Sequence, residues 1–534
     1  MSHTTNTAWQ ALQNLAGTNS TLTELFAQDD KRASTFHLSA PYMVLDYAKA
    51  CLDKTVLDTL INLANECNLS KKINDLMSGK QVNDSENRPA LHTALRLPKG
   101  ESLIVDGTDV SAQVEASLDK CESIAHRIRT GVWRGYSGKA ITDVVSIGVG
   151  GSDLGPLMAV DALAEYKDTA IRVHFVSNMD GTHLQNLLGK LSAETTVFIV
   201  ASKSFGTVDT LSNASTALAW LTTFTAKDVA LRRHFIGVSA NPARMSEWGI
   251  HTDNQLIFWE WVGGRFSMWS AISLSVAIAV GMDNFKRLLN GAYQMDCHFK
   301  SAPFIKNAPV IMGLLAVWNA TFLGINGHTV LPYDGRLKFL PSYLTQLEME
   351  SNGKSVTKDG QTVDYATCPI LWGEVGSNAQ HAFYQLLHQG TQRVSCDFIA
   401  CVSRYDDDSE LAHQHRLALS NCLAQSRVLA FGNDALPDLA SSPNHRYRGN
   451  QPSTTILLDA LTPESLGSLI ALYEHKVYVA SVLWGINPFD QWGVEMGKIM
   501  ANSVFDVLNG QGVGDFDSST NFLLNIIKDS HAHD

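Results

Sequence analysis

The stretch Asp143-Val144-Val145-Ser146-Ile147, which runs directly into Gly148-Val149-Gly150-Gly151-Ser152-Asp153, decides the fold class of this chain. A short run of branched apolar side chains that ends in glycines predicts a buried strand turning into a helix. Similar strands are predicted at residues 171–176, 195–200 and 234–238, each separated from the last by a helical pattern. Strands that alternate with helices form a parallel sheet covered on both faces.

A second series of strands and helices begins after about residue 310. Gly373-Glu374-Val375-Gly376-Ser377 repeats the G-x-x-G-S spacing of the first turn. We therefore expect two related α/β domains with helical arms at both ends of the chain. The expected boundaries give a helical segment at 1–115, α/β domains at 116–290 and 291–510, and a C-terminal arm at 511–534. Further strands are predicted at 329–331, 369–372, 396–401 and 454–458, and a long helix at 463–484.

Composition excludes several classes of protein. The chain has 534 residues, of which 45% are hydrophobic and 18% charged, so it is long enough for large folded domains. Its net charge of -12 argues against a nucleic-acid binder. The eight cysteines form no close pair, which favours reduced thiols in a cytoplasmic protein over a zinc site. We expect no membrane segment, because the most apolar run, 271–282, is too short to span a bilayer.

Two loops suit the binding of an anion. Gly148–Gly155 is no dinucleotide fingerprint, because Asp153 replaces the third glycine, but its free amides could face an oxyanion or sugar hydroxyls. A purely structural turn is the alternative. Ser202-Lys203-Ser204-Phe205-Gly206-Thr207 offers hydroxyls, a lysine and amides at one helix start, which suits a phosphate monoester. The alternative there is a Ser/Thr cap of the helix.

Charged residues in three other segments are candidates for chemistry. Arg265 follows two glycines among aromatic residues, where it could meet a structural partner or an anion formed in a reaction. Glu350 lies near the end of an amphipathic run from about Leu337 that stops at Gly353, a candidate left-handed helix cap. His381 and Lys498 lie on predicted helices. For all of these the alternative is an ordinary structural or solvated side chain. His381 and His388 are expected two turns apart on one helix face, a spacing that does not favour zinc.

Together the motifs closely resemble those of the phosphoglucose isomerase family, in the same order from about residue 140 to 500. They are Trp261-Val262-Gly263-Gly264-Arg265-Phe266-Ser267, Met349-Glu350-Ser351-Asn352-Gly353-Lys354, Gln380-His381-Ala382-Phe383-Tyr384-Gln385 and Phe489-Asp490-Gln491-Trp492-Gly493-Val494-Glu495. The resemblance implies two sugar-isomerase (SIS-type) domains, a homodimer, and neither cofactor nor metal. It also implies reversible isomerisation of D-glucose 6-phosphate and D-fructose 6-phosphate through a cis-enediol, in glycolysis and gluconeogenesis.

The resemblance also implies a role for each matching residue. Glu350 is the proton-transfer base, Arg265 stabilises the enediolate, and His381 and Lys498 serve ring opening. The phosphate loop supplies Ser202, Lys203, Ser204 and Thr207, and the other substrate contacts are Gly151, Ser152, Gln346 and Gln491.

One departure from the family lies in the phosphate loop. The loop usually has the sequence S-K-T-F-T-T, so Ser204 keeps a hydroxyl and Gly206 loses one. Two alternatives to the expected activity remain: a relative that also accepts mannose 6-phosphate, and a non-catalytic regulator that binds sugar phosphates on the same fold. Such a regulator would need the phosphate loop but not Glu350, His381 and Lys498 together.

Overall fold

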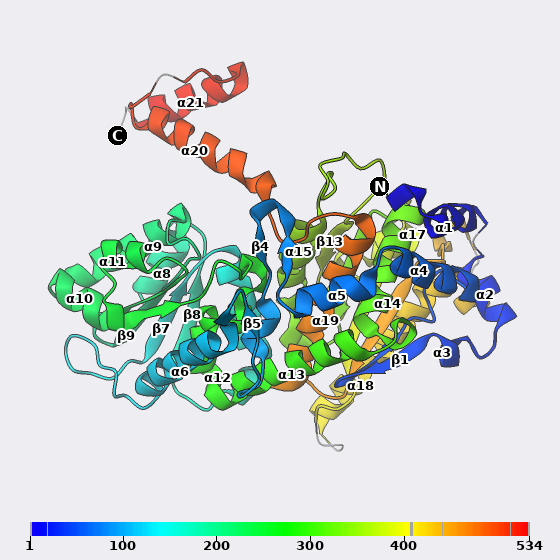
Figure 1. Cartoon of the computed structure of the whole chain (residues 1–534), viewed down its shortest axis with the longest axis horizontal. Helices are drawn as coiled ribbons and strands as arrows, with labels where there is room; N and C mark the ends of the chain where they lie inside the picture. The colour runs from blue at the N-terminus through cyan, green and yellow to red at the C-terminus, as the bar shows by residue number, and fades with distance from the viewer. Residues whose placement is uncertain (1–2, 19, 406–408, 440–441, 513, 532–534) are drawn as a thin grey trace. The chain divides into compact units, whose positions relative to one another are not determined.

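The computed structural model covers the whole chain (Figure 1) and describes residues 3–18, 20–405, 409–439, 442–512 and 514–531. The chain forms two compact units, Met1–Pro488 and Phe489–Asp534. The first unit contains both large sheets, and the second contains the helices α20 (Glu495–Leu508) and α21 (Ser518–His531). The division at residues 115, 290 and 510 stays a prediction.

The first sheet has five parallel strands in the order β11-β10-β9-β7-β8. The four predicted strands agree with β7–β10 to within one residue at each end, but the sequence does not predict β11, which is too short to show a pattern. The strands are β7 (Asp143–Ile147), β8 (Arg172–Val176), β9 (Thr196–Ala201), β10 (Phe235–Ser239) and β11 (Gln255–Ile257). The helices that connect or cover them are α6 (Val110–Arg129), α7 (Leu154–Ala162), α8 (Thr182–Leu188), α9 (Val208–Thr222), α10 (Lys227–His234), α11 (Pro242–Trp248) and α12 (Leu274–Val280).

The second sheet has six strands in the order β1-β2-β15-β14-β12-β13. The predicted parallel strands are confirmed as β12 (Gly327–Pro332), β13 (Ile370–Gly373), β14 (Val394–Cys401) and β15 (Ser453–Leu458). The α/β class with two sheets flanked by helices is therefore confirmed (Figure 1). The first sheet is wholly parallel, and β12–β15 form the parallel part of the second.

The N-terminal segment differs from the helical segment expected. It contains α1 (Thr7–Gly17), α2 (Leu22–Gln28), α3 (Arg32–Thr35), α4 (Lys54–Glu66) and α5 (Leu69–Met77), but also a hairpin of β1 (His37–Ala40) and β2 (Met43–Asp46). Strand β2 pairs antiparallel with β15, so this hairpin completes the second sheet. Neither of these two four-residue strands is predicted from the sequence. The short hairpins β3 (Gln81–Asn83) with β4 (Arg88–Pro89), and β5 (Ile104–Val105) with β6 (Thr108–Asp109), follow.

Helix α19 (Pro463–Trp484), predicted to the residue, is buried along almost its whole length. Its start is fixed by a capping box between Thr462 and Ser465 and by Pro463 in the first turn, and its end by Gly485 in the left-handed region at φ 67°. It packs against α13, α14 and α15. The other helices of this half are α13 (Met282–Ser301), α14 (Ala308–Val317), α15 (Leu340–Asn352), α16 (Gly376–Ala382), α17 (Tyr384–Gln389) and α18 (Glu410–Phe431).

Candidate active site

Helix α15 brings Gln346 and Glu350 to one face, one turn apart. Gln346 Nε2 donates a hydrogen bond of 2.9 Å to Glu350 Oε2. The helix is held by apolar residues on its other face, including the buried Leu344 and Leu347. The Glu350 side chain keeps 25% of its surface exposed. This carboxylate is therefore oriented by its neighbours and still open to a ligand.

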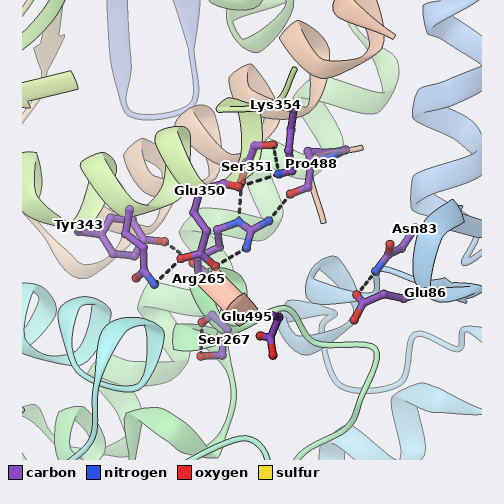
Figure 2. A network of polar contacts seen from close by, with 12 residues as sticks. Asn83, Glu86, Arg265, Ser267, Tyr343, Glu350, Ser351, Lys354, Pro488 and Glu495 are labelled. Atoms are coloured by element: carbon purple, nitrogen blue, oxygen red, sulfur yellow. Dashed lines mark hydrogen bonds and ion pairs between the residues drawn. The ribbon is translucent and has the colours of Figure 1, made fainter. Parts of the chain in front are cut away.

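Arg265 is the buried partner of Glu350. It follows the glycine pair at 263–264 in a 3-10 turn, Gly264–Trp269, and its side chain is 0% exposed. Its Nη1 lies 2.6 Å from Glu350 Oε1, its Nε donates to Ser351 Oγ at 2.6 Å, and its Nη2 donates to the Pro488 carbonyl (Figure 2). A buried guanidinium is stable only when such partners surround it. The arginine is thus fixed beside the carboxylate.

The first glycine turn packs directly on the arginine segment. A Cβ at Gly151 would lie 2.0 Å from the Gly264 carbonyl oxygen, so only glycine fits there. Gly150 has a φ of 59°, and a Cβ on it would lie 3.0 Å from Gln346 Nε2. Ser267 Oγ donates to the carbonyl oxygens of Gly264 at 2.7 Å and Gly151 at 3.3 Å. Three segments far apart in sequence therefore meet: the turn with Gly151 and the half-buried Ser152, the arginine, and α15.

The loop 202–207 lies between β9 and α9, as predicted. Ser202 is buried and its hydroxyl lies 3.0 Å from that of Thr207. Thr207 occupies the cap position of α9, but its side chain makes no capping hydrogen bond, so capping does not account for these hydroxyls. Lys203 Nζ donates to the Glu260 carbonyl oxygen at 2.8 Å, and burial, followed by the charge of Arg88, lowers the pKa of Lys203. The loop gathers hydroxyls and a cation, which is the donor set for a phosphate.

Three further residues are predicted for the site: His381, Gln491 and Lys498. His381 is exposed on α16 and makes no hydrogen bond or ion pair with the described residues. Gln491 and Lys498 belong to the second unit, which is described by itself. There Lys498 lies on α20, is 66% exposed, and pairs with Glu495 Oε1 at 3.0 Å. Their roles stay predictions.

Two expectations about α15 are wrong in part. A glutamate two positions before Glu350 is expected on another face of the helix, as an ordinary exposed polar side chain. Glu348 does lie on another face, but it is 2% exposed, and Lys476 Nζ of α19 donates to it at 2.8 Å. Gly353 does end the helix, but with a φ of -72° it is not left-handed. Glycine is needed there because a Cβ would lie 2.4 Å from the Met349 carbonyl oxygen. In both cases the reason is close packing, which spacing in the sequence does not show.

Two side chains that touch Arg265 are not singled out by the sequence. Ser351 accepts the Nε hydrogen bond, and the Tyr343 hydroxyl donates to the Arg265 carbonyl oxygen at 3.4 Å (Figure 2). Only the position of Ser351, directly after Glu350, could have indicated it. Among the described residues, no cluster of His, Cys, Asp or Glu could hold a metal ion. None of the described helices has both the length and the apolar character needed to cross a membrane.

Comparison with known proteins gives a consistent result. Residues 46–524 match the family model described as phosphoglucose isomerase. The chain is 63% identical to glucose-6-phosphate isomerase from Psychrobacter cryohalolentis, over 97% of this chain and 96% of the relative. It is 53% identical to glucose-6-phosphate isomerase 2 from Chromohalobacter salexigens, over 97% of each. The crystal structure of a glucose-6-phosphate isomerase from Chlamydia trachomatis is similar with a TM-score of 0.88 at 30% identity, covering 98% of this chain and 99% of that one. The chain belongs to the phosphoglucose isomerase family.

Proposed function

We propose that Glu350 is the base with which this chain moves a proton between C1 and C2 of a hexose 6-phosphate. As a member of this family, the chain interconverts D-glucose 6-phosphate and D-fructose 6-phosphate, the isomerisation step of glycolysis and gluconeogenesis. One observation supports the role of Glu350. Its carboxylate lies 2.6 Å from the fully buried Arg265 guanidinium, and the Glu350 side chain itself remains 25% exposed.

The pair of charges suits the proposed proton transfer. A carbon acid next to a carbonyl gives up its proton only if a base receives it and the resulting enediolate is stabilised. When Glu350 takes the proton it loses its negative charge, and the substrate oxygen gains one. Arg265 keeps its positive charge and needs no movement to face the new anion, because buried partners fix its guanidinium. Glu350 then returns the proton to the neighbouring carbon, as a reversible shift requires.

The ends of the substrate have separate binding groups in this proposal. The phosphate is held by Ser202, Lys203, Ser204 and Thr207, supported by the convergence of hydroxyls and lysine in that loop. The sugar hydroxyls face Gly151, Ser152 and Gln346, supported by the packing of the first turn on the arginine segment. We assign Gln491 to substrate binding from the family resemblance alone.

Ring opening needs an acid and a base other than Glu350, which acts at C1 and C2. We assign it to His381 and Lys498. The exposure of His381 on α16 fits the further proposal that the protein is a homodimer in which this histidine serves a site shared with the partner subunit. We also place the protein in the cytoplasm, supported by all eight cysteines being free thiols.

The alternative is a regulator that binds sugar phosphates without turning them over. A coupled assay that follows formation of glucose 6-phosphate from fructose 6-phosphate with the purified protein distinguishes the two. We expect turnover that is unchanged by EDTA. Substrate binding without turnover would favour the regulator, and loss of turnover on chelation would contradict the proposed metal-independent mechanism.

A further inference from the structure

Arg244 lies beside the phosphate loop but belongs to another element. It is on α11, which follows β10, and β10 pairs in parallel with β9, the strand before the loop. The segments after two parallel strands lie at the same edge of a sheet. Asn241 Oδ1 accepts from the Arg244 backbone amide at 3.1 Å and fixes the start of the helix. Arg244 Nη1 donates to the Ser204 carbonyl oxygen at 3.3 Å. The guanidinium thus touches the loop itself.

The guanidinium occupies space that a side chain at position 206 would fill. A Cβ on Gly206 would lie 2.6 Å from Arg244 Nη1 and 3.6 Å from Ser204 Oγ. The loop therefore accommodates either a side chain at residue 206 or the arginine in its observed place. In this chain the hydroxyl expected at position 206 is absent, and a cation stands beside the vacant position.

Most of the Arg244 donors are uncommitted. A guanidinium carries five N–H donors, and within the described residues the side chain makes a single hydrogen bond and no ion pair. The side chain is exposed, so a ligand at the loop can contact it directly. Its planar donors match two oxygens of a phosphate, which a hydroxyl cannot do.

We propose that Arg244 is a further phosphate-binding residue of this isomerase, with its guanidinium in place of the hydroxyl that Gly206 lacks. This inference rests on the proposed phosphate loop. It makes Gly206 and Arg244 a coupled pair: glycine leaves the room that the arginine uses.

The test measures steady-state kinetics and competitive inhibition by inorganic phosphate. Arg244→Ala should raise KM for fructose 6-phosphate and the inhibition constant of phosphate by the same factor, about tenfold, because a charged hydrogen bond is lost. The kcat should stay within about twofold, since phosphate binding is shared by ground and transition states. For Arg244→Lys, KM and the phosphate inhibition constant should fall between those of the wild type and those of Arg244→Ala. The matched control is Arg232→Ala, which removes the same charge from α10, ahead of β10 and so at the opposite edge of the sheet.

A second pair of variants tests the coupling. Gly206→Ala should displace the guanidinium and raise both constants in the wild-type background, but have little effect when Arg244 is already alanine. Equal effects of Gly206→Ala in both backgrounds would overturn the coupling.

Thr207→Val distinguishes an error in the role of Arg244 from an error in the phosphate-binding role of the loop. If Thr207→Val raises both constants while Arg244→Ala changes neither, the loop stands and the role of Arg244 is overturned. If neither variant changes either constant, the phosphate loop itself is wrong, and the role of Arg244 with it. A rise in KM with an unchanged phosphate inhibition constant would also overturn a direct phosphate contact.

Discussion

Two glutamates, two residues apart, lie on different faces of helix α15 and differ in their exposure to solvent. Glu350 meets Arg265, and a quarter of its side chain is open to solvent. Glu348 meets Lys476, and both side chains are at most 3% exposed. Each carboxylate has a cation within hydrogen-bonding distance. The difference is access: in one ion pair the carboxylate is partly exposed, whereas the other pair is enclosed between α15 and α19.

The buried pair extends into a polar network. Burial would lower the pKa of Lys476, but the charges of Glu348 and Asp397 outweigh it and raise that pKa. Asp397 in turn accepts from His328, Thr454 and Tyr473 at 2.6–3.0 Å. Such a network fixes α19 against strands β12, β14 and β15, because each polar group would be costly to leave unpaired. An ion pair is therefore evidence of a reactive site only when a ligand can reach it.

The strongest test of this contrast is Glu350→Gln. We expect turnover to fall by about 10²- to 10⁴-fold, because the amide cannot accept the proton. The apparent melting temperature should fall less than for Glu348→Gln, because Glu350 is partly exposed and Arg265 keeps its hydrogen bonds to Ser351 and to the Pro488 carbonyl oxygen. Coupled-assay kinetics and thermal unfolding check the two effects. Turnover near that of the wild type would remove Glu350 as the base.

Glu348→Gln is the matched variant on the opposite face. It leaves Lys476 buried without its carboxylate partner, so we expect the free energy of unfolding to fall by about 3–5 kcal/mol. Turnover per folded molecule should be nearly unchanged at low temperature. Denaturant unfolding measures the loss, and Glu348→Gln combined with Lys476→Met should recover part of it. A stable variant that has lost turnover would contradict the division between the two faces.

His381→Ala tests a side chain proposed for ring opening. We expect roughly a hundredfold loss of turnover on fructose 6-phosphate, less than for Glu350→Gln, because rings also open unassisted in water. The 5-deoxy analogue of fructose 6-phosphate cannot close a five-membered ring, so it should be turned over by wild type and variant at similar rates. An equal loss on both substrates would count against a ring-opening role.

Asp153 extends the comparison to a carboxylate buried without any cation partner among the described residues. Burial raises its pKa to about 6, against a weaker opposing hydrogen bond from Ser177. The folded state thus binds a proton that the unfolded state has released, and stability falls as pH rises from about 4 to about 6. Asp153→Asn should remove this loss. Its melting temperature should exceed that of the wild type by about 3 °C at pH 7, with little difference at pH 4. A difference that does not vary with pH would contradict this account.

Strands and helices with a clear hydrophobic pattern are predicted from the sequence better than the contacts between distant elements. Strands such as β7 and helix α19 have long enough patterns to be located within a residue. The hairpin β1–β2 and the three-residue strand β11 show no such pattern, and the strand that β2 joins, β15, is distant in sequence. In the site, motifs point to Arg265 and Glu350, but the burial of Glu348 and the contacts of Ser351 depend on which helices pack together, which no local pattern records.

The hairpin β1–β2 has a consequence for the order in which the chain folds during synthesis. Its partner is β15, with Leu45 paired to Ile456, so roughly 400 further residues must be translated before that pairing can form. At a translation rate of about 5–20 residues per second, one edge of the hairpin therefore stays unpaired for tens of seconds. The first sheet, whose strands lie between Asp143 and Ile257, needs no such delay. The first sheet can thus form while the rest of the chain is still being translated. The second sheet is complete only when β2 pairs with β15.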